Sequence, residues 1–597
     1  MIHSFHIPVM GLAFTIDTPI KIAHLGISSV VSIADDFLME KAINFYAEKF
    51  SLPVQPVNRK DIEAKATITT TYLNMMKVIV EKKWEEHIKQ LVQDQGYRDD
   101  FLLLLPDTVY WQNEWQIQAG NLSENALTKW AKTQFKPGSI DVNIMTKVDK
   151  KNFNHGKELP TAYNDAHAAL RGFAQSNLNS SLVLSAGMNL PLFSYIQQFD
   201  DFFPDTEGRF KKRITIKVSD FRSALVQGKM LAKKGLWVSE FRIESGLNCG
   251  GHAFPTQGNL FGPILHEFKQ KRIELYNELL TIWQTELELQ HKVKAPFLPE
   301  MKISAQGGVG THQEHDFLLK HYGINSVGWG SPFLLVPEAV SIDQGTLQQL
   351  ADATENDLYL SHASPLGVPF NNLRNSSKQQ SQKRKIELGK PGNPCTKKFL
   401  QLNTDFGTNP ICTASSKYIN LAITMLNNSN LTKEQIAAEK EKLFEKECLC
   451  CGLAFPFLEE HNLDKKIEGN GVSVCPGPNI AYFDAIYSLS DMIKHIYGSK
   501  NLIKREDRPH MFIKEIQLYM AYLSEKISTI HAEPTEKAKI YLHQFIQNMK
   551  TGLEYYKALF QTELTILDLK FNVQNLLNEF NKSLDNNQSN LLEVYAR

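Results

Sequence analysis

The chain has 597 residues, too many for one hydrophobic core, so we expect roughly two to four domains. Hydrophobic residues make up 42% and charged residues 22%, as in ordinary soluble globular proteins. Lysine plus arginine and aspartate plus glutamate number 65 each, so no overall field attracts nucleic acid or an anionic membrane. No apolar run reaches the ~18 residues that span a bilayer, and the amino end lacks a secretory-signal pattern. We therefore expect a cytoplasmic protein.

The first 375 residues predict a parallel α/β domain. Eight short apolar or β-branched runs are predicted to be strands, at 7–10, 27–33, 140–144, 181–185, 213–218, 236–243, 301–305 and 326–330. Helical patterns separate most of them, for example 20–25, 224–234 and 262–288. This alternation favours a closed (β/α)8 TIM barrel over residues 1–375.

Residues of about 45–137 interrupt this alternation. They contain a long amphipathic helical pattern at 61–95, followed by a predicted aromatic loop with Tyr110, Trp111 and Trp115. We interpret the segment as a helical insertion on the barrel rim. Two roles remain open, because the insertion could act as a lid or simply pack against the outside of the barrel.

Three further regions are expected after the barrel. Residues 376–392 are polar and predict a linker, and residues 393–500 form a cysteine-rich domain. Residues 501–597 predict an α-helical tail, with three amphipathic stretches that begin at Met511 and a break at Pro534. The tail is expected to be structural or to support an oligomer.

Two glycine pairs follow predicted strands and indicate a cofactor site. Cys249-Gly250-Gly251-His252 comes after strand 236–243, and Gly307-Gly308 comes after strand 301–305. Glycines at the end of a strand let backbone N–H groups approach a phosphate closely. A histidine at the same rim can exchange a proton near neutral pH. Together these features predict a cofactor-dependent enzyme.

An ordered set of motifs resembles a known family, the nitronate monooxygenase (2-nitropropane dioxygenase) group of FMN-dependent barrels, which is related to the flavin-dependent enoyl reductases. The motifs occur in the family's order over residues 1–375. They are Ile7-Pro-Val-Met-Gly11, Asp17-Thr18-Pro19, Asp141-Val142-Asn143-Ile144-Met145, Cys249-Gly250-Gly251-His252, Gly307-Gly308-Val309, Ser326-Val-Gly-Trp-Gly330-Ser331, Pro337-Glu338-Ala339 and a final segment at 365–375.

The resemblance implies an FMN site and a catalytic histidine. The residues that it assigns to the cofactor are Met10, Gly11, Asn143, Gly250, Gly251, Gly307, Gly308, Gly330 and Ser331. In barrels of this kind a phosphate commonly binds the loops after the last two strands. His252 is expected to face the flavin and to transfer the substrate proton. Cys249 replaces a small residue of the family, and it is either a second catalytic group or a packing residue.

The remaining six cysteines crowd into a short part of the chain and suggest a metal site. They are Cys395, Cys412, Cys448, Cys450, Cys451 and Cys475. Four thiolates from separate loops can hold an iron–sulfur cluster, whose ligand spacing varies widely. Zinc binding and a set of simple buried thiols are the alternatives, since free cysteine is among the most buried residue types.

The sequence therefore predicts a flavin-dependent oxidoreductase of the nitronate monooxygenase-like group. Proton abstraction by His252 from a small-molecule substrate would be coupled to flavin reduction, and an iron–sulfur cluster would link the flavin to a donor or acceptor protein. An NAD(P)H-dependent enoyl or quinone reductase is the alternative within the enzyme class. A non-catalytic barrel that acts as an assembly or scaffold protein is the alternative from another class.

Overall fold

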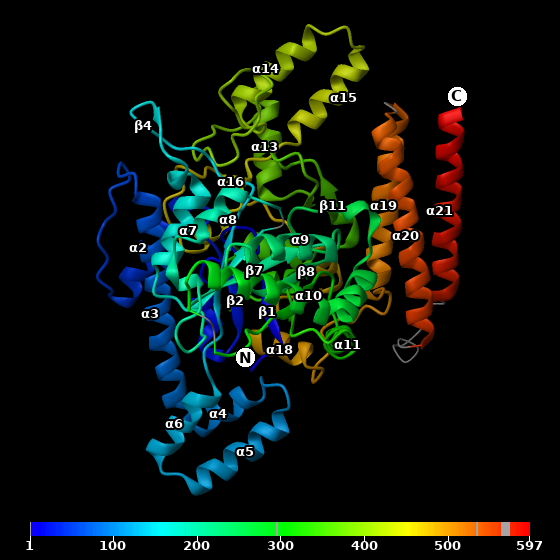
Figure 1. The fold of residues 1–597 in the computed structure, drawn as a ribbon. Coiled ribbons are helices and arrows are strands. Elements are labelled where there is room, and N and C mark those ends of the chain that lie inside the picture. The colour runs from blue at the N-terminus through cyan, green and yellow to red at the C-terminus, as the bar shows by residue number, and fades with distance from the viewer. Residues whose placement is uncertain (1, 186, 294–295, 533–534, 563–572, 597) are drawn as a thin grey trace.

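Eight parallel strands form a closed barrel in the computed structural model, which describes residues 2–185, 187–293, 296–532, 535–562 and 573–596 (Figure 1). The strands are β1 (Phe5–Ile7), β2 (Ser28–Ser32), β3 (Ile140–Ile144), β6 (Ser180–Leu184), β7 (Lys212–Val218), β8 (Val238–Glu244), β9 (Lys302–Gln306) and β10 (Ser326–Gly328). They correspond one by one to the eight predicted runs, and the (β/α)8 barrel is confirmed. The first strand lies earlier than predicted and ends before Pro8, which cannot donate a ladder hydrogen bond.

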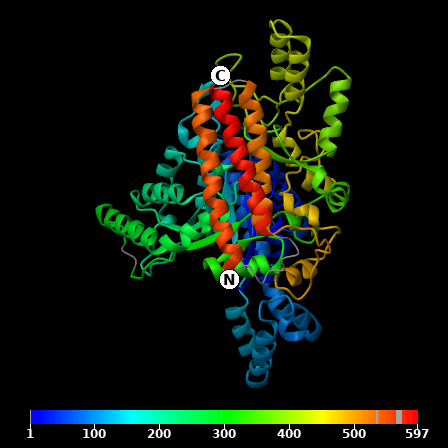
Figure 2. The ribbon, with the colours of Figure 1, turned by 90° about the vertical axis from the view of Figure 1, so that its right-hand side faces the viewer.

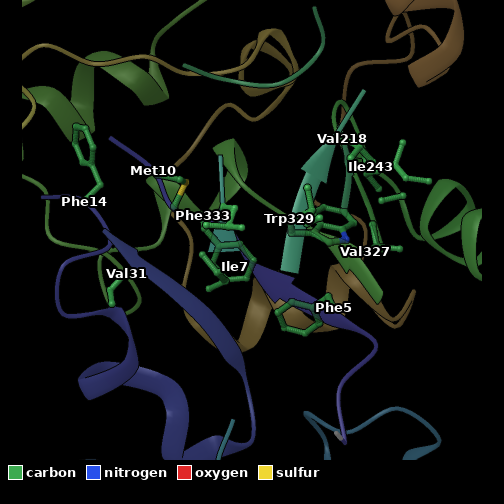
Figure 3. Close-up of a cluster of buried hydrophobic side chains, with 14 of the residues drawn as sticks. Phe5, Ile7, Met10, Phe14, Val31, Val218, Ile243, Val327, Trp329 and Phe333 are labelled. Carbon is green, nitrogen blue, oxygen red and sulfur yellow. The ribbon is translucent and has the colours of Figure 1, made fainter. Parts of the chain in front are cut away.

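Parallel pairing of the first strand with its neighbours closes the barrel. In β1, Phe5 pairs with Val327 of β10, and His6 pairs with Ser28 of β2. The side chains of this region form a dense apolar core, part of which is drawn in Figure 3. Phe5, Ile7, Trp329 and other members are fully buried, so the barrel is a packed core and ligands have to bind at its ends.

Helices surround the strands as the alternating pattern predicts. They include α1 (Thr18–Ile22), α2 (Asp36–Phe50), α3 (Ala64–Gln93), α7 (Asp165–Gln175), α8 (Leu190–Ile196), α9 (Phe221–Ala232), α10 (Phe261–Leu289), α11 (His312–Tyr322) and α12 (Gln344–Ala351). The long helix α3 packs against both α2 and α7. The first half of the predicted insertion therefore belongs to the outer layer of the barrel. A small hairpin, β4 (Phe153–Asn154) with β5 (Lys157–Glu158), follows β3.

The rest of the insertion forms a small helical unit with its own core. It consists of α4 (Gln95–Leu102), α5 (Thr108–Asn121) and α6 (Glu124–Gln134), which pack on the end of α3. Trp115, Phe101 and Phe135 are buried in this core. The predicted aromatic loop is wrong, because Tyr110, Trp111 and Trp115 all lie on α5. On this helix the ring of Trp115 stacks on the ring of Phe135, with centroids 6.1 Å apart.

This helical unit lies at the amino ends of the barrel strands. Ile2, just before β1, and Leu25, just before β2, pack against its core. Figure 1 shows α4, α5 and α6 beyond the end of the barrel at which the chain begins, away from α14 and α15. The α4–α6 unit is therefore not a lid over the carboxyl ends of the strands, and external packing is the correct alternative for this part of the insertion.

The segment predicted as a polar linker contains a helix. After the hairpin of β11 (Leu358–Ser361) and β12 (Phe370–Leu373), helix α13 (Ser377–Glu387) occupies most of residues 376–392. The hydroxyl of Ser376 caps its first turn by accepting from the Gln379 N–H. Gln382 is buried and donates to the carbonyl of Lys446 at 2.8 Å. Polar side chains that find buried partners thus hold the helix in place.

The cysteine-rich segment packs on the barrel. It contains α14 (Ser416–Asn427), α15 (Lys433–Phe444), α16 (Leu449–Gly452), α17 (Phe455–Glu460) and α18 (Leu489–Ile496). Phe457, Ile480 and Met492 are buried in the same apolar core as the barrel strands. Within this segment, α14 and α15 project away from the rest of the molecule (Figure 1).

The tail forms three long helices, as predicted. They are α19 (Met511–Ala532), α20 (Glu536–Thr562) and α21 (Val573–Ala596), and they lie side by side along one flank (Figure 2). The predicted break at Pro534 lies outside the described residues. Among the described residues, none of the helices is both long and apolar enough to cross a membrane.

Candidate active site

A cavity opens where the strands of the barrel end. The loops after β1, β8, β9 and β10 line it. All the residues that the sequence assigned to a cofactor border this cavity: Met10, Gly11, Asn143, Gly250, Gly251, Gly307, Gly308, Gly330 and Ser331. Motifs that are far apart in the chain are therefore brought together at one end of the barrel.

The loop after β9 requires glycine for two reasons. Gly307 has φ = 130° and Gly308 has φ = 79°, which are conformations that side chains rarely adopt. A Cβ atom on Gly308 would lie 2.0 Å from Nδ2 of Asn248. The glycine pair therefore lets the loops after β8 and β9 lie against each other at the wall of the cavity.

The cysteine-rich segment supplies part of the cavity wall, which the sequence did not predict. Cys475 and Asn479 line the cavity, and the Asn479 amide donates to the carbonyl of Val309 at 2.8 Å. The N–H of Gly477 donates to Oγ of Ser331 at 2.6 Å, so the Ser331 hydroxyl keeps its own hydrogen for another acceptor. The only sequence signal was the turn-forming run Cys475-Pro-Gly-Pro478.

Charged side chains on β7 and β8 form the floor of the cavity and were also missed. Lys217 Nζ lies 3.2 Å from Oε1 of Glu244. Arg242 is buried and lies 2.9 Å from Glu240. Burial alone would lower the pKa of Arg242, but the charges of Glu240 and Asp141 raise its pKa, so it stays cationic. Regular alternation along a strand would have pointed to these residues.

Three buried amide oxygens in the cavity lack a partner. Oδ1 of Asn143, Oδ1 of Asn248 and Oε1 of Gln306 accept no hydrogen bond within the described part of the chain. An unpaired buried acceptor is costly, so such atoms indicate that a ligand donates to them. The N–H edge of an isoalloxazine ring can donate to such an oxygen, and a phosphate on the glycine loops would accept from their backbone N–H groups. The residues present therefore fit FMN.

His252 does not line this cavity, contrary to the expectation that it faces the cofactor. It lines a second, mostly apolar cavity, together with Phe399, Leu400, Leu449 and Leu453. The two cavities adjoin, because pairs of consecutive residues divide between them: Gly11 and Leu12, Asn143 and Ile144, Gly251 and His252.

The imidazole of His252 is held in its neutral form. Its Nε2 lies 2.7 Å from the hydroxyl of Ser364, and its ring packs on Phe370 with centroids 5.0 Å apart. Burial, with a smaller effect of Lys217, lowers the pKa of His252 to about 4. A neutral imidazole next to an apolar cavity can accept a proton or hold a polar group of a bound molecule.

The Cys249 thiol is a poor candidate for a nucleophile. It lines the first cavity and its Sγ donates to the carbonyl of Gln306 at 3.4 Å. Burial, with the charge of Glu244, raises the pKa of Cys249 well above its ordinary value. Because the thiolate is the reactive form, the geometry favours the packing role.

The other six cysteines do not converge on one point. Within the described residues, which include all seven cysteines, no group of three or more His, Cys, Asp or Glu side chains is arranged to hold a metal ion. A hydrogen bond from Cys412 lowers the pKa of Cys395 to about 7, and Cys448 is similarly paired with Cys451. All six belong to, or pack against, a small apolar core with Phe399 and Leu400. This arrangement gives no support to a four-thiolate iron–sulfur cluster.

Comparison with known proteins adds little to this geometry. No family model and no curated protein sequence matches the chain. Among solved structures, FabK from Thermotoga maritima is 12% identical, with a TM-score of 0.30, over 68% of this chain and 86% of that one. The enoyl reductase domain of MlnA, from the macrolactin biosynthesis cluster of Bacillus amyloliquefaciens, is also 12% identical, with a TM-score of 0.29, over 73% of this chain and 88% of that one. Similarity this distant carries no argument about activity.

Proposed function

We propose that the protein is an FMN-dependent oxidoreductase that acts on an apolar substrate. The observation that carries the proposal is the pair of adjoining cavities at the carboxyl ends of the barrel. One cavity is lined by both polar and apolar residues and is bordered by glycine loops, and the other is mostly apolar and contains a histidine. Sites of this kind, at this end of a barrel, are where (β/α)8 enzymes carry out their chemistry.

In this proposal the first cavity holds FMN. The loops with Gly307-Gly308 and Gly330-Ser331 bind its phosphate through backbone N–H groups and the Ser331 hydroxyl. The unpaired oxygen of Asn143 accepts from the edge of the ring system. Bound FMN supplies the ability to take up or deliver a hydride or single electrons. At the floor of the cavity, Lys217 and Arg242 form ion pairs with Glu244 and Glu240.

The second cavity favours the enoyl-reductase alternative over nitronate oxidation. Its lining is mostly aliphatic or aromatic, and its charged members, Lys65 and Asp165, pair with each other at 3.6 Å, so it suits a hydrocarbon portion of a substrate better than a small, anionic nitronate. His252, which is hydrogen-bonded to Ser364, is suited to hydrogen-bond a carbonyl group. In the reductase, His252 therefore orients the substrate, whereas in the nitronate reaction it would have to remove a proton.

Anaerobic mixing distinguishes the two reactions. FMN-loaded protein is mixed with NADH or NADPH in one experiment and with an alkyl nitronate in another, and flavin absorbance is followed. The proposal predicts bleaching by a reduced nicotinamide nucleotide, and reoxidation when an α,β-unsaturated acyl thioester is added. Bleaching by the nitronate alone would support nitronate oxidation and would contradict the proposed reductase reaction.

A His252→Ala variant tests the role of the second cavity. We expect it to keep FMN and its reduction by nucleotide, because His252 does not border the first cavity. Turnover of the unsaturated substrate should fall about 100-fold, a typical loss for one positioned proton-transfer or hydrogen-bonding group. Unchanged turnover would remove His252 from the site.

A further inference from the structure

The start of the helical tail touches both glycine loops of the candidate active site. Arg508, Met511, Glu515 and Tyr519, which we call the brace, lie at the beginning of α19 or just before it. Arg508 contacts the loop after β9, and Met511 and Glu515 contact the loop after β8. The hydroxyl of Tyr519 lies against Gly246 of the loop after β8. Neither loop is near the brace in sequence. The brace therefore links the C-terminal tail to the cavity wall.

Arg508 holds the loop after β9. Its guanidinium forms two hydrogen bonds to the carboxylate of Glu314, at 2.9 and 2.8 Å, and it donates to the carbonyl of Gly308 at 3.1 Å. Glu314 also accepts from the N–H groups of Gly310 and Met511, at 2.8 and 2.7 Å. The side chains of the ion pair are only 7% and 2% exposed. A buried, bidentate pair of this kind fixes orientation strongly.

Glu515 holds the loop after β8. Its carboxylate accepts from the hydroxyl of Ser245 at 2.7 Å, from the N–H of Phe261 at 2.9 Å and from the hydroxyl of Tyr556 at 3.0 Å. The amide of Asn248 donates to the carbonyl of Met511 at 3.1 Å. Ser245 and Asn248 thus join the tail immediately before Cys249-Gly250-Gly251, which borders the cavity.

The same loops need support from outside. The N–H of Ser245 donates to the carbonyl of Gln306 at 3.0 Å, and Gly308 lies directly against Asn248. Glycines with positive φ have a large conformational freedom, so their conformation is fixed only when neighbouring groups hold it. A merely apolar contact between α19 and the barrel would not fix the direction of backbone N–H groups.

We propose that the brace sets the phosphate-binding conformation of both glycine loops, and that Arg508 and Glu515 are positioning residues of the site. The inference rests on the proposed function, since it assigns the loops to the phosphate of FMN. It gives the tail a role in the site: the loops bind an anion well only while α19 is docked. Pre-organisation of this kind raises affinity without any new contact to the ligand.

The experiment uses the full chain and compares three variants. Arg508→Lys keeps the charge but loses the planar fork, and Ser245→Ala removes the loop partner of Glu515. Lys514→Gln is the matched control, because Lys514 lies on the same helix but pairs with Glu355 instead of a glycine loop. Hydrogen–deuterium exchange of residues 245–251 and 306–311 is measured without added FMN, together with thermal unfolding.

The expected result is at least tenfold faster exchange in the loop that each variant releases, 306–311 for Arg508→Lys and 245–251 for Ser245→Ala. In the control, exchange should match the wild type. FMN titration should show at least tenfold weaker binding for both brace variants, with a Tm no lower than that of the control. Unchanged loop exchange in both variants would overturn the inference, whether or not FMN binds. Wild-type protein that binds no FMN would instead overturn the proposed function, while the exchange data would still decide whether the brace exists.

Discussion

The two ends of the barrel carry additions that differ in kind. At the amino ends, α4, α5 and α6 form a unit with its own small core around Trp115 and Phe135. The cysteine-rich segment and the helical tail, parts of which reach the carboxyl ends, share the main core of the barrel. They also contribute Cys475 and Asn479 to the candidate active site, and Arg508 and Glu515 to its support.

The difference shows which additions can affect chemistry. A unit that buries its own apolar residues and contacts only the amino ends can change without moving the cavity. Segments that are hydrogen-bonded to the glycine loops cannot change without moving the cavity wall, because the loop conformation depends on them. The following predictions test this contrast, starting with the largest effect.

Gly308→Ala should almost abolish FMN binding, with a loss of 100-fold or more. The new Cβ would overlap the amide of Asn248 and would also be strained at φ = 79°. Gly323→Ala is the control, because Gly323 also has positive φ but has no atom within 4 Å of a new Cβ. FMN affinity is measured by quenching of flavin fluorescence. Equal affinity of the two variants would contradict the placement of the cofactor.

Trp115→Ala should destabilise the amino-end unit by about 4 kcal/mol, as expected for removal of a buried tryptophan side chain. Urea unfolding and limited proteolysis within 95–134 measure the effect. FMN affinity should stay within twofold of the wild type, because Trp115 is distant from the loops that border the cavity. A parallel loss of FMN affinity would show that the two ends are coupled and would remove the contrast.

Glu515→Gln should change how stability depends on pH. Burial raises the pKa of Glu515 from 4.5 to about 7, so the folded chain keeps its proton longer than the unfolded chain does. The wild type therefore loses up to about 3 kcal/mol of stability from this group as pH rises from 4.5 to 7. Glutamine cannot ionise, so the variant lacks this loss.

Denaturant unfolding at several pH values between 4 and 8 measures the effect. The other titratable groups that face Glu515 are Tyr322, Tyr519, Tyr556 and Cys249, and burial raises the pKa of each, so they stay neutral over this range. Wild-type and variant stabilities that run parallel across this range would show that Glu515 is ionised at its ordinary pKa.

Cys395 should react first among the cysteines. The hydrogen bond from Cys412 is the main reason why the pKa of Cys395 falls to about 7, and Cys395 is only partly buried. Mass spectrometry after brief alkylation at pH 7.5 should find the label there, and a Cys395→Ser variant should lose it. If Cys395 is instead protected, and a chelator or a reductant removes the protection, then a metal ion or a disulfide engages its thiol.

Much of the barrel was predictable because buried parallel strands are short apolar runs with turn residues on both sides. Glycine pairs at strand ends revealed the first cavity for the same local reason. The contributions of Asn479 and Arg508 were not predictable, since nothing near them in the sequence indicates that they reach Val309 or Gly308. Such contacts depend on how the C-terminal segments dock.

The position of His252 was missed because a backbone turn decides it. Gly251 has φ = 79°, and the chain then pairs as an isolated bridge with Phe370. This pairing directs His252 into the second cavity, while Gly251 remains at the first cavity. The prediction of an aromatic loop was wrong for another reason, because aromatic side chains also form the core of a short helical unit.

The most direct test of the account is the visible spectrum of the protein after incubation with FMN and gel filtration. If FMN binds the first cavity, two resolved flavin bands stay with the protein at one FMN per chain, and the Gly308→Ala variant loses them. A wild-type protein that emerges colourless, with FMN only in the small-molecule fractions, would contradict the account.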